Sequence, residues 1–191
     1  MFRKSLAAIF VPLFITITAA AFAGNPSSGQ SGAPENATLS GAFSALHAVS
    51  QYSINLSEMA AKRAKSDLVK GYARDMAIAN ENAEGKLRAM AQKRSIDIAP
   101  LDPQTEAGKS LLDRIKAETV LLGSLEGDAW DKEYMTLVTN TQQSVIHLLE
   151  SRKALTRDPE AKQFFGDLMT TVQNRLTTAQ DVMAKIYGNE V

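Results

Sequence analysis

Apolar residues recur at intervals of three and four along most of the chain, which is the period of an amphipathic α-helix. The pattern is clearest over residues 67–94, where one helix face carries a continuous apolar stripe: Leu68, Tyr72, Met76, Ala79, Ala83, Leu87 and Met90. The same period predicts long helices over residues 38–63, 128–155 and 159–187, and a shorter one over 105–122. Since no stretch alternates with a period of two, we predict an all-α protein.

Residues typical of helix ends separate these segments. Ser66, Asp128 and Asp158 are predicted N-caps, and Pro159 suits the first position of the last helix. Four long amphipathic helices with one longer connection predict a ferritin-like four-helix bundle, with a short extra helix between the second and third long helices. Short links place the first helix beside the second and the third beside the fourth, and they leave the remaining pairing open.

The N-terminus has the pattern of a targeting segment. Arg3 and Lys4 precede an uncharged stretch over residues 6–20, and Ala21-Phe22-Ala23 fits a small-x-small cleavage site. We expect a signal peptide over residues 1–23, a flexible linker over 24–37 and a bundle domain over 38–188. The protein is therefore expected in the periplasm, with peripheral association with the envelope as one form of this location. The alternative is an uncleaved membrane anchor, because the apolar run is borderline for crossing a bilayer.

Composition excludes several classes of chemistry. The 191 residues carry 21 Lys and Arg, 21 Asp and Glu, two His and no Cys, so there is no basic field for nucleic acid and no thiol chemistry. Bundles that hold two metals use Glu-x-x-His motifs, but Ser44 precedes His47 and Ser144 precedes His147 at that spacing. We predict no enzyme, cofactor or metal site, and expect each His at the boundary of the buried face of its helix, with one hydrogen bond.

Polar residues interrupt the apolar faces of three helices. Asn80, Gln142 and Arg175 each lie three or four residues from members of an apolar stripe. If these faces meet, the bundle has a polar layer or pocket in its middle. For Arg175 the alternative is that Leu176 takes the buried position and the guanidinium extends to water. The first helix adds small polar side chains on nearly one line: Ser50, Ser53 and Ser57.

An aromatic pair marks the start of the third long helix. Trp130 and Tyr134 are four residues apart, and Asp131 between them suits the positive end of the helix dipole. We interpret this group as a packing and capping element, with stacking on a ligand as the alternative.

Several of these residues occur in motifs that resemble a known family. Trp130-Asp131-x-x-Tyr134 and Asp158-Pro159-x-x-Lys162 resemble motifs of a bacterial family of secreted, ferritin-like proteins named domain of unknown function 4142, and similar patterns occur over residues 59–76 and 176–179. The resemblance implies a helical fold and export. It also implies that Asn80, Gln142 and Arg175 stand where family members carry His. An amide, an amide and a guanidinium cannot share a metal as imidazoles can.

These observations favour a non-enzymatic binding protein of the bacterial envelope, whose partner is a protein or a small ligand, with a role in envelope stress suggested by the resemblance. The alternative is a ferritin-like metal or redox protein that uses carboxylates and a residual polar core. The sequence does not indicate the oligomeric state.

Overall fold

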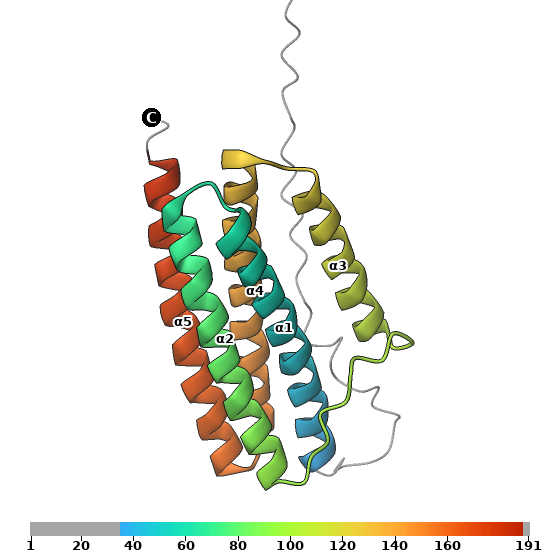
Figure 1. Ribbon diagram of the computed structural model, residues 1–191. Helices are drawn as coiled ribbons and strands as arrows, with labels where there is room; N and C mark the ends of the chain where they lie inside the picture. The colour runs from blue at the N-terminus through green and yellow to red at the C-terminus, as the bar shows by residue number, and fades with distance from the viewer. Residues whose placement is uncertain (1–34, 189–191) are drawn as a thin grey trace, which may run out of the picture.

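The computed structural model describes residues 35–188, which form five helices (Figure 1): α1 (Glu35–Arg63), α2 (Asp67–Lys93), α3 (Glu106–Gly123), α4 (Gly127–Leu155) and α5 (Pro159–Tyr187). No strand occurs in this part of the chain. The predicted all-α bundle with an extra helix in the long connection is confirmed, whereas its ferritin-like classification stays a prediction. The helix at the start of the bundle begins three residues before the expected position 38. The predicted signal peptide and residues 24–34 of the predicted linker lie outside the described residues.

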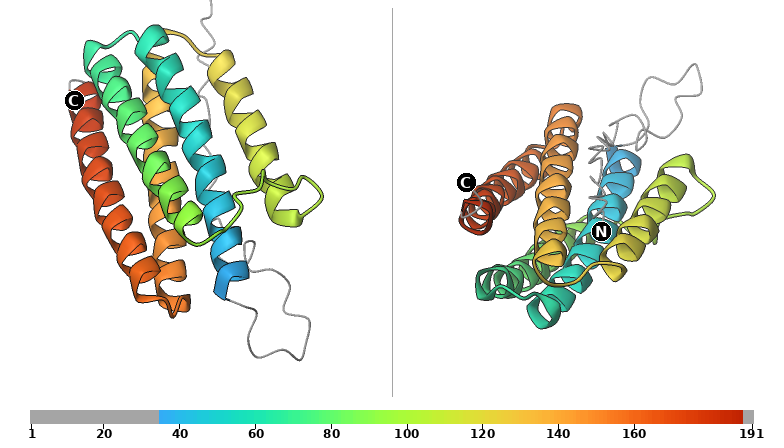
Figure 2. Two further views of the ribbon diagram at one scale, coloured as in Figure 1. Left: turned by 60° about the horizontal axis from the view of Figure 1, so that its bottom comes forward. Right: turned by 90° about the horizontal axis from the view of Figure 1, so that it is seen from above.

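The bundle consists of two antiparallel helix pairs. The contacts between α1 and α2 and between α4 and α5 are the most extensive, and the pairs meet through α2 against α5 and α1 against α4. Because α2 ends at the opposite end of the bundle from the start of α4, the connection must run back along its whole length (Figures 1 and 2). The extra helix α3 makes this return on the outside of the bundle, where it contacts α4.

Two helix starts agree with their sequence signals. The carboxylate of Asp158 accepts a hydrogen bond from the backbone N–H of Ala161 at 2.8 Å, and Pro159 is the first residue of α5. The hydroxyl of Thr105 accepts from the N–H of Gly108 at 3.1 Å and caps α3. Both caps satisfy backbone donors that a helix N-terminus leaves without intrahelical partners.

Two other starts differ from the prediction. Ser66 is the N-cap of α2 by backbone conformation, but its side chain makes no capping hydrogen bond. The predicted cap at Asp128 is wrong, because α4 begins one residue earlier and its N-cap is Glu126. Gly127 has a positive φ of 59°, which glycine adopts without strain, and this lets the chain enter the helix before Asp128. Asp128 instead pairs with Lys65 at 2.8 Å on the surface.

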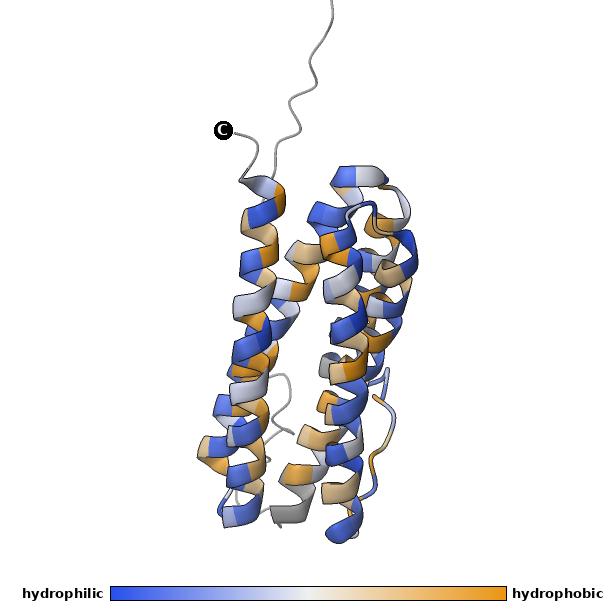
Figure 3. Cartoon of the chain, turned by 60° about the vertical axis from the view of Figure 1, so that its left-hand side comes forward, coloured by the Kyte–Doolittle hydropathy of each residue, from blue (hydrophilic) through white to orange (hydrophobic). Residues whose placement is uncertain are grey.

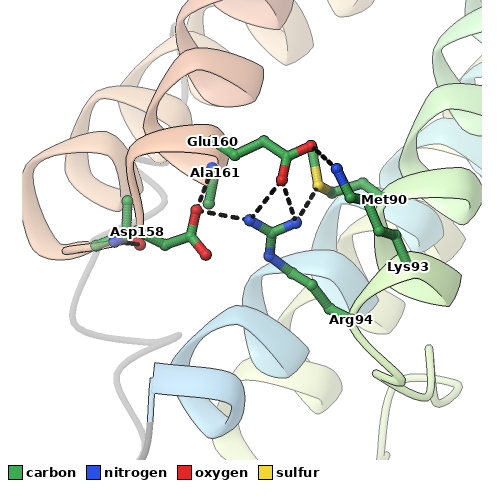
Figure 4. Close-up of polar contacts among 7 residues, drawn as sticks. Met90, Lys93, Arg94, Asp158, Glu160 and Ala161 are labelled. Atoms are coloured by element: carbon green, nitrogen blue, oxygen red, sulfur yellow. Dashed lines mark hydrogen bonds and ion pairs between the residues drawn. The ribbon is translucent and has the colours of Figure 1, made fainter.

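A charged network joins the end of α2 to the start of α5 (Figure 4). Arg94, the C-cap of α2, donates to the carboxylate of Asp158 at 2.6 Å and also contacts Glu160. Lys93 pairs with the same Glu160 at 2.6 Å. The hydrogen bond from Arg94 is the main cause that lowers the pKa of Asp158, with the N–H of Ala161 as a second cause. Cationic groups at the end of one helix thus hold the capping acid of another.

The buried apolar side chains form two separate clusters along the bundle, on the inward faces that Figure 3 shows in orange. The first cluster lies at the end where α4 begins and includes Leu56, Tyr72, Met76, Trp130, Tyr134 and Val138. The second lies at the end where α5 begins and includes Phe43, Leu46, Leu87, Leu149, Phe165 and Val172. Each of the four long helices contributes to both clusters, so the polar level between them crosses the whole bundle.

Some predicted core positions are exposed. Leu68, expected on the buried stripe of α2, is 48 % exposed, and its neighbour Val69 is fully buried instead. On α3, Leu112 and Val120 are exposed, because this helix packs on the bundle from one side only. Periodic apolar residues therefore predict the helix correctly, but the residue predicted to be buried near the helix start can be wrong by one position.

Candidate ligand cavity

Asn80, Gln142 and Arg175 lie at the level between the two apolar clusters. Asn80 follows Met76 of the first cluster and precedes Leu87 of the second, and the other two hold equivalent places on α4 and α5. All three line one cavity that also borders α1. The structure thus brings together the three candidates that the sequence singled out.

Arg175 reaches from α5 to α2 rather than into water. Its guanidinium donates to the side-chain oxygen of Asn80 at 3.0 Å and to the backbone carbonyl of Ala79 at 2.7 Å. Burial disfavours the charged form and lowers the pKa of Arg175. Among the described residues, no carboxylate lies within ion-pair distance of this guanidinium, so its charge is met by amide and carbonyl oxygens alone.

Gln142 bonds with a residue of the first apolar cluster rather than with Arg175. Its side-chain nitrogen donates to the hydroxyl of Tyr72 at 2.7 Å, and it does not accept from Arg175. The reason is the position of Tyr72, which lies two turns before Asn80 on α2 and faces α4. Burial raises the pKa of Tyr72, so its phenol stays neutral.

A charged group lies one turn beyond Asn80 on the same helix. Glu84 is buried, and its Oε1 accepts from Arg88 at 2.6 Å and lies 2.6 Å from Nδ1 of His47 on α1. His47 is therefore a boundary histidine with one hydrogen-bond partner, as the sequence predicts. Both contacts of Glu84 fall on one oxygen, and the other oxygen has no partner.

Three buried polar atoms on the cavity walls have no hydrogen-bond partner in the described part of the chain: Asn80 Nδ2, Glu84 Oε2 and Gln142 Oε1. Each of these residues is at most 8 % exposed. A buried polar atom without a partner costs about 1–3 kcal/mol. The cavity has a volume of about 60 Å³, whereas one water needs roughly 10–15 Å³ on this measure. The space can therefore hold several waters or a small molecule that satisfies these atoms.

The aromatic and capping candidates lie elsewhere, in the first apolar cluster. The rings of Trp130 and Tyr134 stack with centroids 5.5 Å apart and are fully buried, so neither presents a face to the cavity. Asp131 was expected to serve its own helix. Its two oxygens instead accept from the backbone N–H groups of Lys65 and Ser66, at 2.9 and 2.7 Å, in the turn between α1 and α2.

The remaining polar groups give no second candidate site. Within residues 35–188, no group of three or more His, Cys, Asp and Glu side chains lies in a position to hold a metal ion. His147 is exposed on the surface and lies 3.5 Å from Glu150, one turn along α4. No helix in this range is long and apolar enough to cross a membrane.

These features define a helical-bundle protein with a small polar cavity between two helix pairs. The chain belongs to the family described as domain of unknown function (DUF4142), whose sequence model matches residues 25–182. The replacement of family histidines at the three cavity positions stays a prediction.

The fold is also similar to that of a solved structure from Streptomyces coelicolor, described as "putative secreted protein DUF305". The TM-score is 0.61 and the identity is 16 %, over 78 % of this chain and 93 % of the other, so the likeness concerns the fold alone. Comparison with curated proteins gave no match.

Sequence reasoning missed one polar group of the cavity wall, Glu84, and one polar partner behind the wall, the hydroxyl of Tyr72 that contacts Gln142. Glu84 was not singled out, although it follows Asn80 by one turn and therefore faces the same way. The hydroxyl of Tyr72 was counted only as part of an apolar stripe. The signal for Glu84 is present in the sequence, since a polar residue four positions from another polar intrusion extends the same patch.

Proposed function

We propose that this protein is a non-enzymatic binding protein of the bacterial envelope, and that the cavity between its two helix pairs binds a small polar molecule. The observation that carries the proposal is the group of three unpartnered buried polar atoms on one set of walls. Folding leaves few such atoms in natural proteins unless water or a ligand satisfies them.

The cavity walls favour a ligand rather than a reaction. Leu46, Val172 and other apolar side chains surround a few fixed polar groups, which is the usual make-up of a small-molecule site. The site contains no pair of a nucleophile and an adjacent base among its lining residues. Asn80, Glu84 and Gln142 can bind and orient a ligand by hydrogen bonds, and this role requires no catalytic group.

The proposal includes export. Residues 1–23 act as a signal peptide that is removed before Gly24. Residues 24–37 form a flexible linker, and residues 38–188 form the bundle domain that functions in the periplasm. The structural neighbour's description as secreted is in keeping with this proposal. The intact mass of protein released from the periplasm tests it, and we expect the mass of a chain that begins at Gly24. A retained Met1, or a membrane fraction that resists carbonate, would contradict cleavage.

A thermal-shift series with small carboxylates, amines and polyols tests ligand binding. We expect at least one compound to raise the melting temperature with increasing concentration, because a ligand that binds only the folded state stabilises it. The series is repeated with Ala83→Leu, which fills the cavity from α2, and with Ala89→Leu at an exposed position of the same helix.

The effect should disappear in Ala83→Leu and persist in Ala89→Leu. The proposal fails if no compound stabilises the protein and a crystal structure shows only ordered water on the three atoms. A role of the protein during envelope stress is the wider part of the proposal, and growth of a deletion strain under such stress tests it.

A further inference from the structure

The charges around the cavity restrict the class of ligand, given the binding function proposed above. Arg175 is a half-buried cation whose partners are the neutral oxygens of Asn80 and Ala79. A guanidinium has five N–H donors, and only two contacts are made here. An anion in the cavity would therefore supply the opposite charge that the described residues do not supply.

A second donor lies beside the guanidinium. Because Arg175 can only donate, it fixes the orientation of the Asn80 amide with its oxygen toward α5 and its nitrogen free. Gln142 can add a third donor, since the hydroxyl of Tyr72 accepts or donates equally well and the amide can turn over. Donors from α2, α4 and α5 thus border the same cavity and suit the two oxygens of a carboxylate.

Glu84 requires the opposite kind of group. Its free Oε2 is an acceptor only, so a ligand must bring a donor to it. Asn80 and Glu84 are four residues apart on α2, which separates their positions by about 6 Å along the helix axis. A small ligand can meet both if its donor lies on the carbon next to its carboxylate.

The size of the cavity supports the same class. Its volume of about 60 Å³ corresponds to roughly four to six water-sized positions, which matches a molecule of about six non-hydrogen atoms. Val145, Leu168 and Val172 form apolar wall beside the polar groups, and they can accept a methyl or similar short side chain.

We propose that the cavity binds a small carboxylate with an amino or hydroxyl group on its second carbon. The carboxylate binds Arg175 and Asn80, and the amino or hydroxyl group donates to Glu84.

Isothermal titration of the mature protein with propionate, lactate and L-alanine tests this assignment, because the three differ only at the second carbon. We expect propionate to bind at least about tenfold more weakly than L-alanine, since it leaves Glu84 without a donor. Lactate should lie between them, because its donor is neutral. Equal affinity for all three ligands, or tightest binding of propionate, would overturn the role of Glu84.

Two variants locate the contacts, with a third as control. Arg175→Gln should abolish binding of all three ligands. Glu84→Gln should remove most of the preference for L-alanine over propionate. Arg88→Gln changes the exposed partner of Glu84 outside the cavity wall, and the order of affinities should be kept. Melting curves of each variant verify the fold, and the ligand series on the unchanged protein tests the proposal even if a variant does not fold.

Failure of this inference differs from failure of the proposed function. If none of the three carboxylates binds but an amine or polyol stabilises the protein in a way that Ala83→Leu abolishes, the ligand class is wrong and the binding function stands. If no compound of any class stabilises the protein and a crystal structure shows only ordered water on the three atoms, both proposals fail.

Discussion

At the scale of single residues, Asp131 connects parts of the chain that are distant in sequence. Its carboxylate lies on α4 and is 3 % exposed, yet it accepts two backbone N–H groups from the turn between α1 and α2. Ser66, the N-cap of α2, makes no side-chain cap, and Asp131 instead holds the backbone of the two residues just before this helix. One side chain therefore fixes the position of the first helix pair relative to the second.

Replacement of Asp131 should cost much more stability than replacement of its neighbour. Asp131→Ala removes two hydrogen bonds from backbone N–H groups to a buried carboxylate, and we expect a loss of about 3 kcal/mol in the free energy of unfolding. Asp131→Asn keeps one acceptor oxygen and should lose less. Asp128→Ala removes only the exposed pair with Lys65, and ion pairs between exposed side chains contribute little to stability. Urea denaturation of the three variants checks the order, and similar losses for Asp131→Ala and Asp128→Ala would contradict it.

At the scale of helices, the ends are held by groups from neighbouring helices. Arg94 at the end of α2 contacts Asp158 at the start of α5, so the two helix termini stabilise each other. This arrangement makes stability depend on pH, because the pKa of Asp158 is lowered in the folded state. A lowered pKa contributes stability that is present above the ordinary aspartate value and is lost as pH falls through the folded value.

We expect the melting temperature to fall as the pH decreases below about 4, in part through protonation of Asp158. The Asp158→Asn variant should melt at a lower temperature than the unchanged protein at pH 6. The difference between the two should shrink as the pH falls through the lowered pKa of Asp158, where this carboxylate becomes protonated. Thermal melts across this range measure the effect, and a difference that stays constant with pH would show that the charge of Asp158 contributes nothing.

The helix α3 differs from the other four in how it is held. It contacts the bundle from one side, and Leu112, Val120 and Leu121 are exposed on it. Two polar contacts attach it to the bundle. Glu118 accepts from Tyr52 of α1 at 2.5 Å, and Arg114, which pairs with Glu118 within the helix, donates to Thr141 of α4 at 3.1 Å. Since little apolar surface is buried, α3 should open more easily than the bundle.

Hydrogen exchange should therefore be faster along α3 than along α2. Tyr52→Phe removes the hydrogen bond to Glu118, and this variant should speed exchange in α3 several-fold while leaving α2 and α5 unchanged. Exchange measured by mass spectrometry resolves the helices. Equal acceleration in all of them would mean that α3 opens only when the whole bundle unfolds.

At the scale of the whole molecule, two apolar clusters provide the core of the fold. We expect the mature protein to be almost entirely helical and to fold without a metal ion, because apolar contacts between the four long helices supply its stability. Circular dichroism melts with and without EDTA measure this, and the two curves should coincide. A large drop of the melting temperature in EDTA would contradict the prediction.

The period of the sequence predicts which segments are helical, and local signals such as Asp158-Pro159 predict where some of them begin. The sequence also predicts where along the bundle the polar layer lies, because Asn80 and Gln142 interrupt the apolar faces of α2 and α4. What the sequence does not give is the partner of each polar group. The contact of Gln142 with Tyr72 depends on the rotation of α4 against α2, which the packing of the whole bundle sets.

The long return along α3 means that a single connection joins the two helix pairs. If the chain were cut between residues 94 and 105, one fragment would be the α1–α2 hairpin and the other would hold α3 with the α4–α5 hairpin, and each would keep its own most extensive contacts. Their association would become a bimolecular equilibrium. The free energy of association between the two helix pairs could then be obtained from the dissociation constant of the two fragments. Because the cavity walls come from both fragments, a ligand of the cavity would tighten that constant, and fragment complementation would serve as a sensor for the ligand.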